Sequence, residues 1–273
     1  MKSYKTKSFL VKKSNKELYN YCLSTAINYK ALYNHTLFFI RNLFTGLKKP
    51  VEERFHNEIF VCHYVFNSIN NVRTNKNKDI KYPSYTSPFI SYETLDHIFK
   101  DMKDEVYYSL NTSCSQQAMK AVFHNMNSFF KSLKEYNKNS YKYNSKPKFP
   151  KYLKNFTTIT LTNQACIIKQ NQNGKCYLKF PKFNKLSPKL FLGNFINKND
   201  NLKEVRIVPI HDDFKIELVL EVEDQDVQFQ NPKKMIGIDI GSNNIATIVN
   251  NIGLSPMIIK GNVIKSYNHF FNK

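Results

Sequence analysis

The sequence predicts an α+β protein with more than one domain, on three observations. Its 273 residues, 41% of them hydrophobic, are enough to build two modest cores. The spacing of apolar residues is helical up to about residue 136 and becomes alternating after about residue 155. A further apolar strand with one acidic residue begins near residue 235. Helices are therefore expected first, then a β-rich region, then the start of another domain.

The N-terminal half is predicted to contain one strand followed by helices. Residues 2–11 mix lysines with apolar and aromatic side chains, which favours a strand. Ser14 is a suitable N-cap for the helix that follows, and helical spacing then continues to about residue 136. Pro83 and Pro88 interrupt this spacing, so we expect at least two helical blocks.

The region after about residue 155 is predicted to form several short strands. Its clearest hairpin covers residues 205–222, where two apolar strands flank a polar turn at 211–213. Asn173 and Gly174 predict another turn. Short strands with such turns are typical of a small barrel or sandwich.

The charge of the chain indicates a polyanionic partner. The formal net charge is +20 at pH 7, from 41 Lys and Arg residues against 21 Asp and Glu residues. Nucleic acid is the first candidate for a partner. No run of about 18 apolar residues occurs, and the N-terminus lacks the apolar core of a signal peptide. We therefore expect a cytoplasmic, nucleoid-associated protein with no membrane partner and no small-molecule substrate.

The cysteines do not have the spacing of a metal site. The five of them are scattered, and none forms a C-x-x-C pair. No cysteine and histidine lie at the spacing of a tetrahedral zinc site. We expect reduced structural thiols and no zinc site in Cys22, Cys62, Cys114, Cys166 and Cys176.

Residues 236–246, IGIDIGSNNIA, predict a strand, a glycine-containing turn and a second strand. This pattern places Asp239 inside a sheet, where a lone carboxylate is costly unless a cation or hydrogen bonds compensate. Mg²⁺ or Mn²⁺ would compensate, so Asp239 is the candidate catalytic and metal-binding residue. An exposed aspartate at a strand end is the alternative. Actin-like ATPases and sugar kinases open with a similar hairpin that grips nucleotide phosphates.

Lysines alternate with aromatic residues between Tyr141 and Tyr152, a composition that suits phosphate contacts and base stacking. A charged linker whose lysines stay in solvent is the alternative. The excess of positive charge favours nucleic-acid contact. The candidate nucleic-acid-binding residues are Lys142, Lys146, Lys148, Lys151, Tyr152, Lys154, Lys179, Lys182, Lys260 and Lys265.

Four blocks, in this order and spacing, resemble one protein family. They are residues 115–131 with PKFP at 147–150, residues 178–183, the hairpin 204–223, and residues 236–246 with the basic segment 259–273. Together they are similar to the TnpB or OrfB family, transposon-encoded RNA-guided DNA endonucleases related to CRISPR type V effectors. In this family an RNA guide directs cleavage of matching double-stranded DNA.

The resemblance implies an architecture for the whole chain. Its parts are an OB-like β-barrel called the wedge, a helical recognition insert that splits it, and a RuvC domain with the ribonuclease H fold. The implied boundaries are 1–13 for the first wedge strand, 14–140 for the insert, 141–230 for the wedge barrel and 231–273 for the first hairpin and strand of the RuvC-like domain. Guide RNA and target DNA are the implied partners, and Mg²⁺ or Mn²⁺ is the implied cofactor.

The sequence departs from the family at the nuclease site. The family supplies a Glu and a second Asp downstream of the first motif, with a zinc ribbon nearby. After Asp239 this sequence contains no Asp or Glu. We therefore expect a C-terminally truncated chain that is inactive as a nuclease, with a nuclease-dead RNA- or DNA-binding regulator as the alternative.

Overall fold

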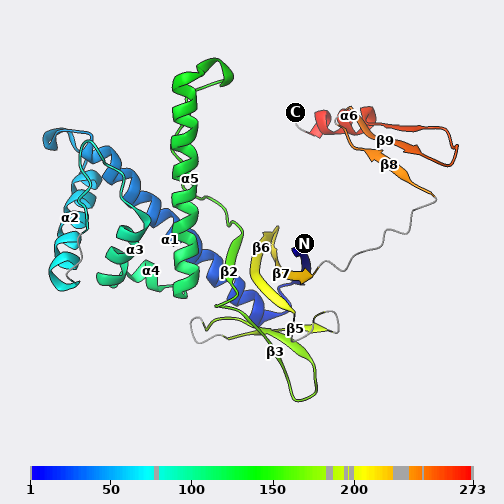
Figure 1. Cartoon of the computed structure of the whole chain (residues 1–273), viewed down its shortest axis with the longest axis horizontal. Coiled ribbons are helices and arrows are strands. Elements are labelled where there is room, and N and C mark those ends of the chain that lie inside the picture. Colours follow the sequence, from blue (N-terminus) through cyan, green and yellow to red (C-terminus); the bar gives the residue numbers. More distant parts are fainter. Residues whose placement is uncertain are drawn as a thin grey trace. The chain divides into compact units, whose positions relative to one another are not determined.

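The computed structural model describes residues 2–76, 80–182, 187–193, 196, 200–223, 234–241 and 243–271. The chain divides into two compact units, Met1–Glu223 and Asp224–Lys273 (Figure 1). Some features of the sequence analysis lie outside the described residues. These are the domain boundary between residues 230 and 231, Phe183 in the second family block, and the last two residues of the chain.

The first unit contains a group of helices built on one long helix. Figure 1 shows this helix, α1, extending from the strands to α2, with α5 packed across it. The helices are α1 (Lys16–Leu47), η1 (Val51–Glu53), α2 (His56–Lys76), α3 (Tyr92–Asp101), α4 (Glu105–Tyr108), α5 (Thr112–Lys138) and η2 (Ser140–Lys142). The predicted break near Pro83 and Pro88 is confirmed, because both prolines lie between α2 and α3. Leu32 of α1, Ile69 of α2 and Met119 of α5 are fully buried in a shared core.

The predicted N-cap of α1 is wrong by one residue. Asn15, not Ser14, precedes the first helical residue, and its side-chain oxygen accepts a hydrogen bond from the Leu18 backbone N–H at 3.5 Å. An asparagine amide is as good an N-cap as a serine hydroxyl, so composition alone does not separate the two positions.

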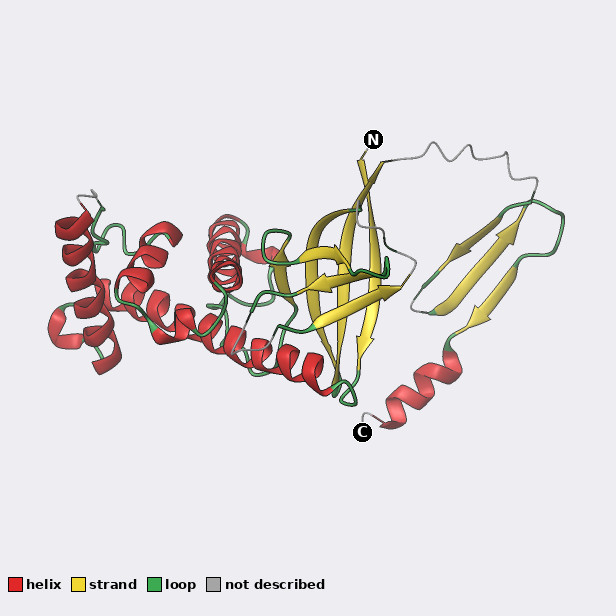
Figure 2. Ribbon diagram, turned by 90° about the horizontal axis from the view of Figure 1, so that it is seen from below, coloured by secondary structure: helices red, strands yellow, loops and turns green. Residues whose placement is uncertain are grey.

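Two antiparallel sheets complete the first unit (Figure 2). The larger sheet has the order β1-β7-β6-β2, with β1 (Lys2–Val11), β7 (Asp213–Glu223), β6 (Asn201–Ile210) and β2 (Ile159–Thr162). The smaller sheet has the order β3-β4-β5, with β3 (Ile167–Gln170), β4 (Cys176–Lys179) and β5 (Lys189–Gly193). In the larger sheet α5 contacts β2 and α1 contacts β7, so helices and strands share one core.

The predicted hairpins are confirmed, and the N-terminal strand pairs with the second strand of the larger one. β1 pairs with β7 along its whole length, from Lys2 opposite Glu223 to Val11 opposite Phe214. β6 and β7 form the hairpin, and its turn contains His211 in the left-handed region at φ 48°. The turn between β3 and β4 contains Gly174 at φ 75°.

The strands do not close into a barrel within the described residues. β1 and β2 are the two edges of the larger sheet, and each pairs with one neighbour only. The smaller sheet pairs with no strand of the larger one in the described part of the chain. Both sheets are therefore open in the described residues, whereas an OB-like β-barrel was predicted.

The second unit is a three-stranded antiparallel sheet followed by a helix. Its elements are β8 (Ile236–Asp239), β9 (Asn244–Asn250), β10 (Met257–Lys260) and α6 (Asn262–Phe271), with strand order β10-β9-β8. The predicted strand-turn-strand of residues 236–246 is confirmed by the pairing of β8 with β9. Ala246 is the one buried hydrophobic residue among those described in this unit.

Candidate nucleic-acid interface

The basic segment of residues 146–156 lies between η2 and β2 and is bound along α1. Asn34 of α1 makes two hydrogen bonds with the backbone of Leu153. Its side-chain Nδ2 donates to the Leu153 carbonyl at 3.1 Å, and its Oδ1 accepts from the Leu153 N–H at 2.7 Å. Lys30 Nζ donates to the carbonyl of Lys154 at 3.3 Å. The backbone of the segment is therefore anchored to α1, while its lysine side chains remain exposed.

The segment runs antiparallel to α1. At the C-terminal end of the segment, the Nζ atom of Lys30 lies over the ring of Phe156, 5.3 Å from the ring centre. Toward its N-terminal end, the ring of Phe149 lies 5.5 Å from that of Phe44. From Lys30 to Phe44 the helix rises about 21 Å. Residues 149–156 cover about the same length at about 3.1 Å per residue, so an extended chain fits this face of α1.

Exposure along the segment repeats every three residues. Pro147, Pro150 and Leu153 are partly buried, whereas the lysines one position later are exposed. A three-residue repeat in a proline-containing chain is typical of the polyproline II conformation. These exposed lysines, which we call the lysine row, are Lys148, Lys151 and Lys154.

The lysine row has no carboxylate partner among the described residues, and the same holds for the exposed Lys146. Lys142 differs, since it lies in η2 and pairs with Glu135 at 3.5 Å. The hydrogen bond from Asn139 and the charge of Lys142 hold the pKa of the Glu135 carboxyl below its usual range. Of the predicted residues in this region, Lys142 is the one whose charge is already compensated.

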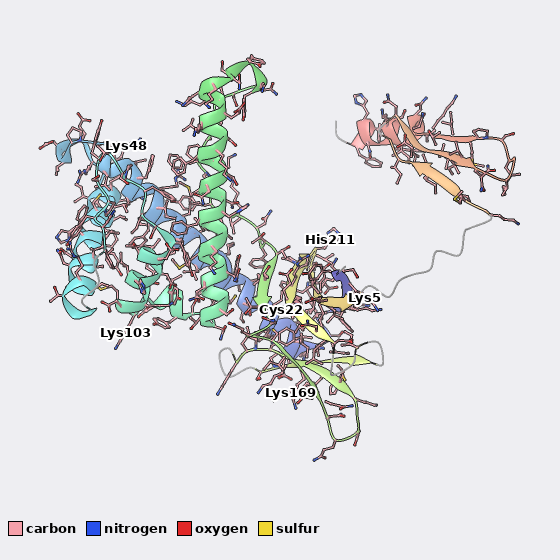
Figure 3. All side chains as sticks on the ribbon, in the orientation of Figure 1. Lys5, Cys22, Lys48, Lys103, Lys169 and His211 are labelled. Atoms are coloured by element: carbon pink, nitrogen blue, oxygen red, sulfur yellow. The ribbon has the colours of Figure 1, made fainter. Side chains whose placement is uncertain are left out.

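Lys179 and Lys182 lie together beside the smaller sheet. They line an open groove of about 300 Å³ whose apolar wall includes Ile167 and Phe180. Lys169 of β3, labelled in Figure 3, lines the same groove and was not among the predicted residues. The register explains this grouping, because Lys179 lies opposite Ile167, two residues before Lys169 on β3. The signal in the sequence is the two-residue spacing of Ile167 and Lys169, which puts both side chains on the same face of a strand.

Arg41 is a further candidate that was not among the predicted residues. Its Cζ lies 5.7 Å from the ring centre of Phe149 and 5.3 Å from that of Tyr152. It is one of four arginines in the chain, and it follows Lys30 and Asn34 on the helix face that meets the segment. The spacing places the three residues on one face of α1, but only the structure shows that this face meets the segment.

Asp239 is exposed, contrary to the expectation that it is buried inside a sheet. It is the last residue of β8 and lies opposite Thr247 of β9. No described element of the second unit covers β8, whose residues are all exposed, so within this unit the carboxylate remains in solvent and needs no compensating cation. Among the described residues, no group of three or more His, Cys, Asp or Glu side chains could hold a metal ion.

The other two predicted lysines also belong to the second unit. Lys260 is exposed at the end of β10. Lys265 of α6 donates from Nζ to the Asn243 side-chain oxygen at 2.5 Å. Each unit therefore carries its own candidate contacts.

The cysteines are buried free thiols, as expected. Burial raises the pKa of the Cys22 and Cys114 thiols to about 12, so neither forms a thiolate at neutral pH. None of the helices in the described ranges has the length and apolar character needed to cross a lipid bilayer.

No protein-family model matches the sequence, and no curated protein matches it. Among solved structures, the chain is similar to a cryo-EM structure of a Cas12f1-sgRNA-target DNA complex, with 11% identity, a TM-score of 0.27 and coverage of 97% of this chain. It is also similar to a CRISPR-Cas12f ternary complex, with 14% identity, a TM-score of 0.30 and 84% coverage. The matches cover 59% and 50% of those two chains.

Proposed function

We propose that this chain is the nucleic-acid-binding part of a TnpB-like RNA-guided DNA endonuclease associated with an insertion-sequence transposon. The observation that carries the proposal is the lysine row, displayed on an anchored segment with no carboxylate partner among the described residues. The four-block resemblance supports the choice of family, and the net charge of +20 supports a nucleic-acid partner. Such a protein would act in the cytoplasm, at the nucleoid.

The lysine row suits the phosphates of a nucleic-acid backbone. At about 3.1 Å per residue, Lys148, Lys151 and Lys154 repeat about every 9 Å. Each phosphate that a lysine neutralises releases condensed counterions, which favours binding and makes it sensitive to salt. Because Asn34 and Lys30 hold the backbone behind the row, less conformational entropy is lost on binding than from a free lysine-rich linker.

The proposed partners are a guide RNA and the double-stranded DNA that it matches. Lys179 and Lys182, with Lys169 in the same groove, offer a second set of phosphate contacts in the first unit. Lys260 and Lys265 offer contacts in the second unit. Lys142 contributes less, since Glu135 already neutralises its charge.

The resemblance assigns Asp239 to a RuvC-like nuclease site that uses Mg²⁺ or Mn²⁺. The residues present do not fit that site. A two-metal site holds its ions about 3.5–4 Å apart and needs several fixed oxygen ligands. Asp239 is the one Asp or Glu among the described residues of the second unit, 234–241 and 243–271. We therefore propose that this chain binds nucleic acid without cutting it.

A nuclease-dead regulator is the second candidate function, and the isolation of Asp239 favours it. The two candidates differ in how DNA is recognised. Duplex DNA that binds only when a matching RNA is already bound supports the RNA-guided protein. Duplex DNA that binds equally well without RNA supports the regulator.

The test of the proposed function is a salt series. Binding of a labelled structured RNA and a labelled DNA duplex is measured by fluorescence anisotropy for the unsubstituted chain and for Lys148→Gln, Lys151→Gln, Lys154→Gln combined. Each lost phosphate contact makes the slope of log K against log salt shallower by about 0.7 to 0.9. The matched control replaces three exposed lysines elsewhere, Lys5, Lys12 and Lys16, by glutamine. Equal slopes for the two triple variants, or no binding by the unsubstituted chain, would refute the proposal.

A further inference from the structure

Arg41 lies between two aromatic rings, Phe149 and Tyr152, in a row of side chains that begins at Phe129 on the core and ends at the surface. Phe129 of α5 stacks on Phe149, with ring centres 4.7 Å apart and planes 25° apart. The Arg41 guanidinium lies 5.7 Å from Phe149 and 5.3 Å from Tyr152. Tyr152 is 41% exposed. The stack therefore ends in an accessible aromatic ring beside an arginine.

The charge of Arg41 has no counter-ion among the described residues. The side chain is partly buried, and no carboxylate lies within ion-pair distance of it. Contacts with aromatic rings favour a guanidinium over an ammonium, because the guanidinium is planar and more weakly hydrated. The contacts with Phe149 and Tyr152 leave the N–H donors of Arg41 available for hydrogen bonds to an anion.

The surroundings hold Arg41 and Tyr152 in place. Asn34 fixes the backbone of Leu153, the neighbour of Tyr152, by two hydrogen bonds. Phe149 is held between Phe44 and Phe129. A ligand that binds here therefore meets side chains whose positions are already restricted, which lowers the entropic cost of binding.

We propose that Arg41 and Tyr152 form a nucleotide subsite for single-stranded nucleic acid. Arg41 binds a phosphate through paired N–H donors, and Tyr152 stacks on an unpaired base next to it. Lys151 and Lys154 flank Tyr152 in the lysine row, so neighbouring phosphates can continue along it. The inference rests on the proposed function and adds to it a preference for a single strand, because paired bases do not offer a free face for stacking.

Substitution of Arg41 tests the phosphate contact. The probes are a labelled oligouridine RNA and a labelled DNA duplex. Arg41→Lys keeps the charge and loses the planar fork, so we expect about 5- to 10-fold weaker binding of the single strand with an unchanged salt slope. Arg41→Gln should also make the slope shallower by about 0.7. The matched control is Arg73→Lys, which changes another arginine that lies over a tyrosine, Tyr82, at 5.1 Å.

Substitution of Tyr152 tests the stacking contact. Tyr152→Phe should bind the single strand as the unsubstituted chain does, whereas Tyr152→Leu should bind it several-fold more weakly and leave duplex binding unchanged. Thermal unfolding of each variant shows whether the fold is kept. Because Tyr152 is exposed, its variants should disturb the fold less than the Arg41 variants do.

The outcomes separate the subsite from the proposed function. Single-strand binding by Arg41→Lys or Tyr152→Leu that equals that of the unsubstituted chain would overturn the subsite. The proposed function would still stand in that case if the lysine-row variant remained impaired. Equal losses on the single strand and on the duplex would also overturn the subsite, because they would indicate a general effect on the surface. An unsubstituted chain that binds neither probe would overturn both.

Discussion

Asn34 and Leu153 lie 119 residues apart in the sequence and are joined by two hydrogen bonds, of 2.7 and 3.1 Å. One asparagine amide satisfies both the N–H and the carbonyl of a single residue in a segment outside regular secondary structure. This pair attaches the basic segment to α1 and thereby positions the lysine row and Tyr152. The role of the segment therefore depends on a residue that carries no charge.

We expect Asn34→Ala to lower the free energy of unfolding of the first unit by about 1–3 kcal/mol, because the Leu153 backbone groups lose their partner. It should also weaken nucleic-acid binding without removing a charge. Urea unfolding and anisotropy measure the two effects. The control is Asn42→Ala on the same helix, whose amide donates only to the Phe38 carbonyl of its own helix at 2.9 Å. Equal losses of stability in the two variants would contradict the anchoring role.

The stability of the first unit should depend on pH through Asp104. Burial alone would raise the pKa of the Asp104 carboxyl, but the hydrogen bond and charge of His35, at 2.9 Å, and backbone N–H groups outweigh it and hold that pKa below its usual range. The carboxylate therefore stabilises the fold above the unfolded pKa of about 3.9, and this stabilisation is lost as pH falls through the folded value.

The measurement is urea unfolding from pH 7 down to about pH 3. Asp104→Asn should flatten the fall in stability below pH about 4. Asp212→Asn is the control, because the Asp212 side chain is 90% exposed. A pH profile of Asp104→Asn that matches the unsubstituted one would show that the pKa of the Asp104 carboxyl is not lowered by folding.

We expect no metal-dependent cleavage by the 273-residue chain. A single exposed carboxylate at Asp239 cannot hold two metal ions at the distance that phosphodiester cleavage uses. Labelled DNA, with and without a matching RNA, is incubated with the chain in Mg²⁺ or Mn²⁺ and separated by electrophoresis. Cutting that disappears in Asp239→Ala and persists in the control Asp212→Ala would show that Asp239 has the ligands it needs.

The second unit should exchange its amide hydrogens quickly or associate with other chains. Ile236 and Ile238 of β8 are 68% and 60% exposed, and Ile240 just after β8 is 80% exposed, so the apolar surface of this segment contributes little to folding. An apolar sheet with free edges also invites association. Hydrogen exchange by mass spectrometry should find the first unit protected and residues 235–271 unprotected in a monomer. Slow exchange across residues 236–249 in a monodisperse monomer would contradict this expectation.

A charged substitution on β8 tests whether the exposed apolar surface of the second unit causes association with other chains. Ile238→Lys should reduce association and leave the unfolding of the first unit unchanged, because the side chain is already exposed. The same change at Leu218, which is fully buried in the larger sheet, should unfold the first unit. Analytical ultracentrifugation and circular dichroism measure these effects.

The sequence by itself determined the local elements and the chemistry of the exposed surface. Alternation along residues 205–222 was enough to predict the hairpin of β6 and β7, and Gly174 marked a turn that requires a positive φ. The lysine row could be identified as a nucleic-acid candidate because lysines and aromatic residues alternate in a single stretch. These features depend on neighbouring residues, and a periodic pattern reports which side of an element faces the core.

Only the tertiary structure decided which distant residues act together and which are covered. Arg41 became a candidate because α1 brings it to Tyr152, and no local pattern links the two positions. Asp239 was predicted to be buried but is exposed, because burial depends on which elements pack over β8. Among the described residues of the second unit, none packs over it. The two sheets are open for a similar reason, since closure depends on how edge strands meet in space. Contacts between distant residues follow from packing, which a one-dimensional pattern does not contain.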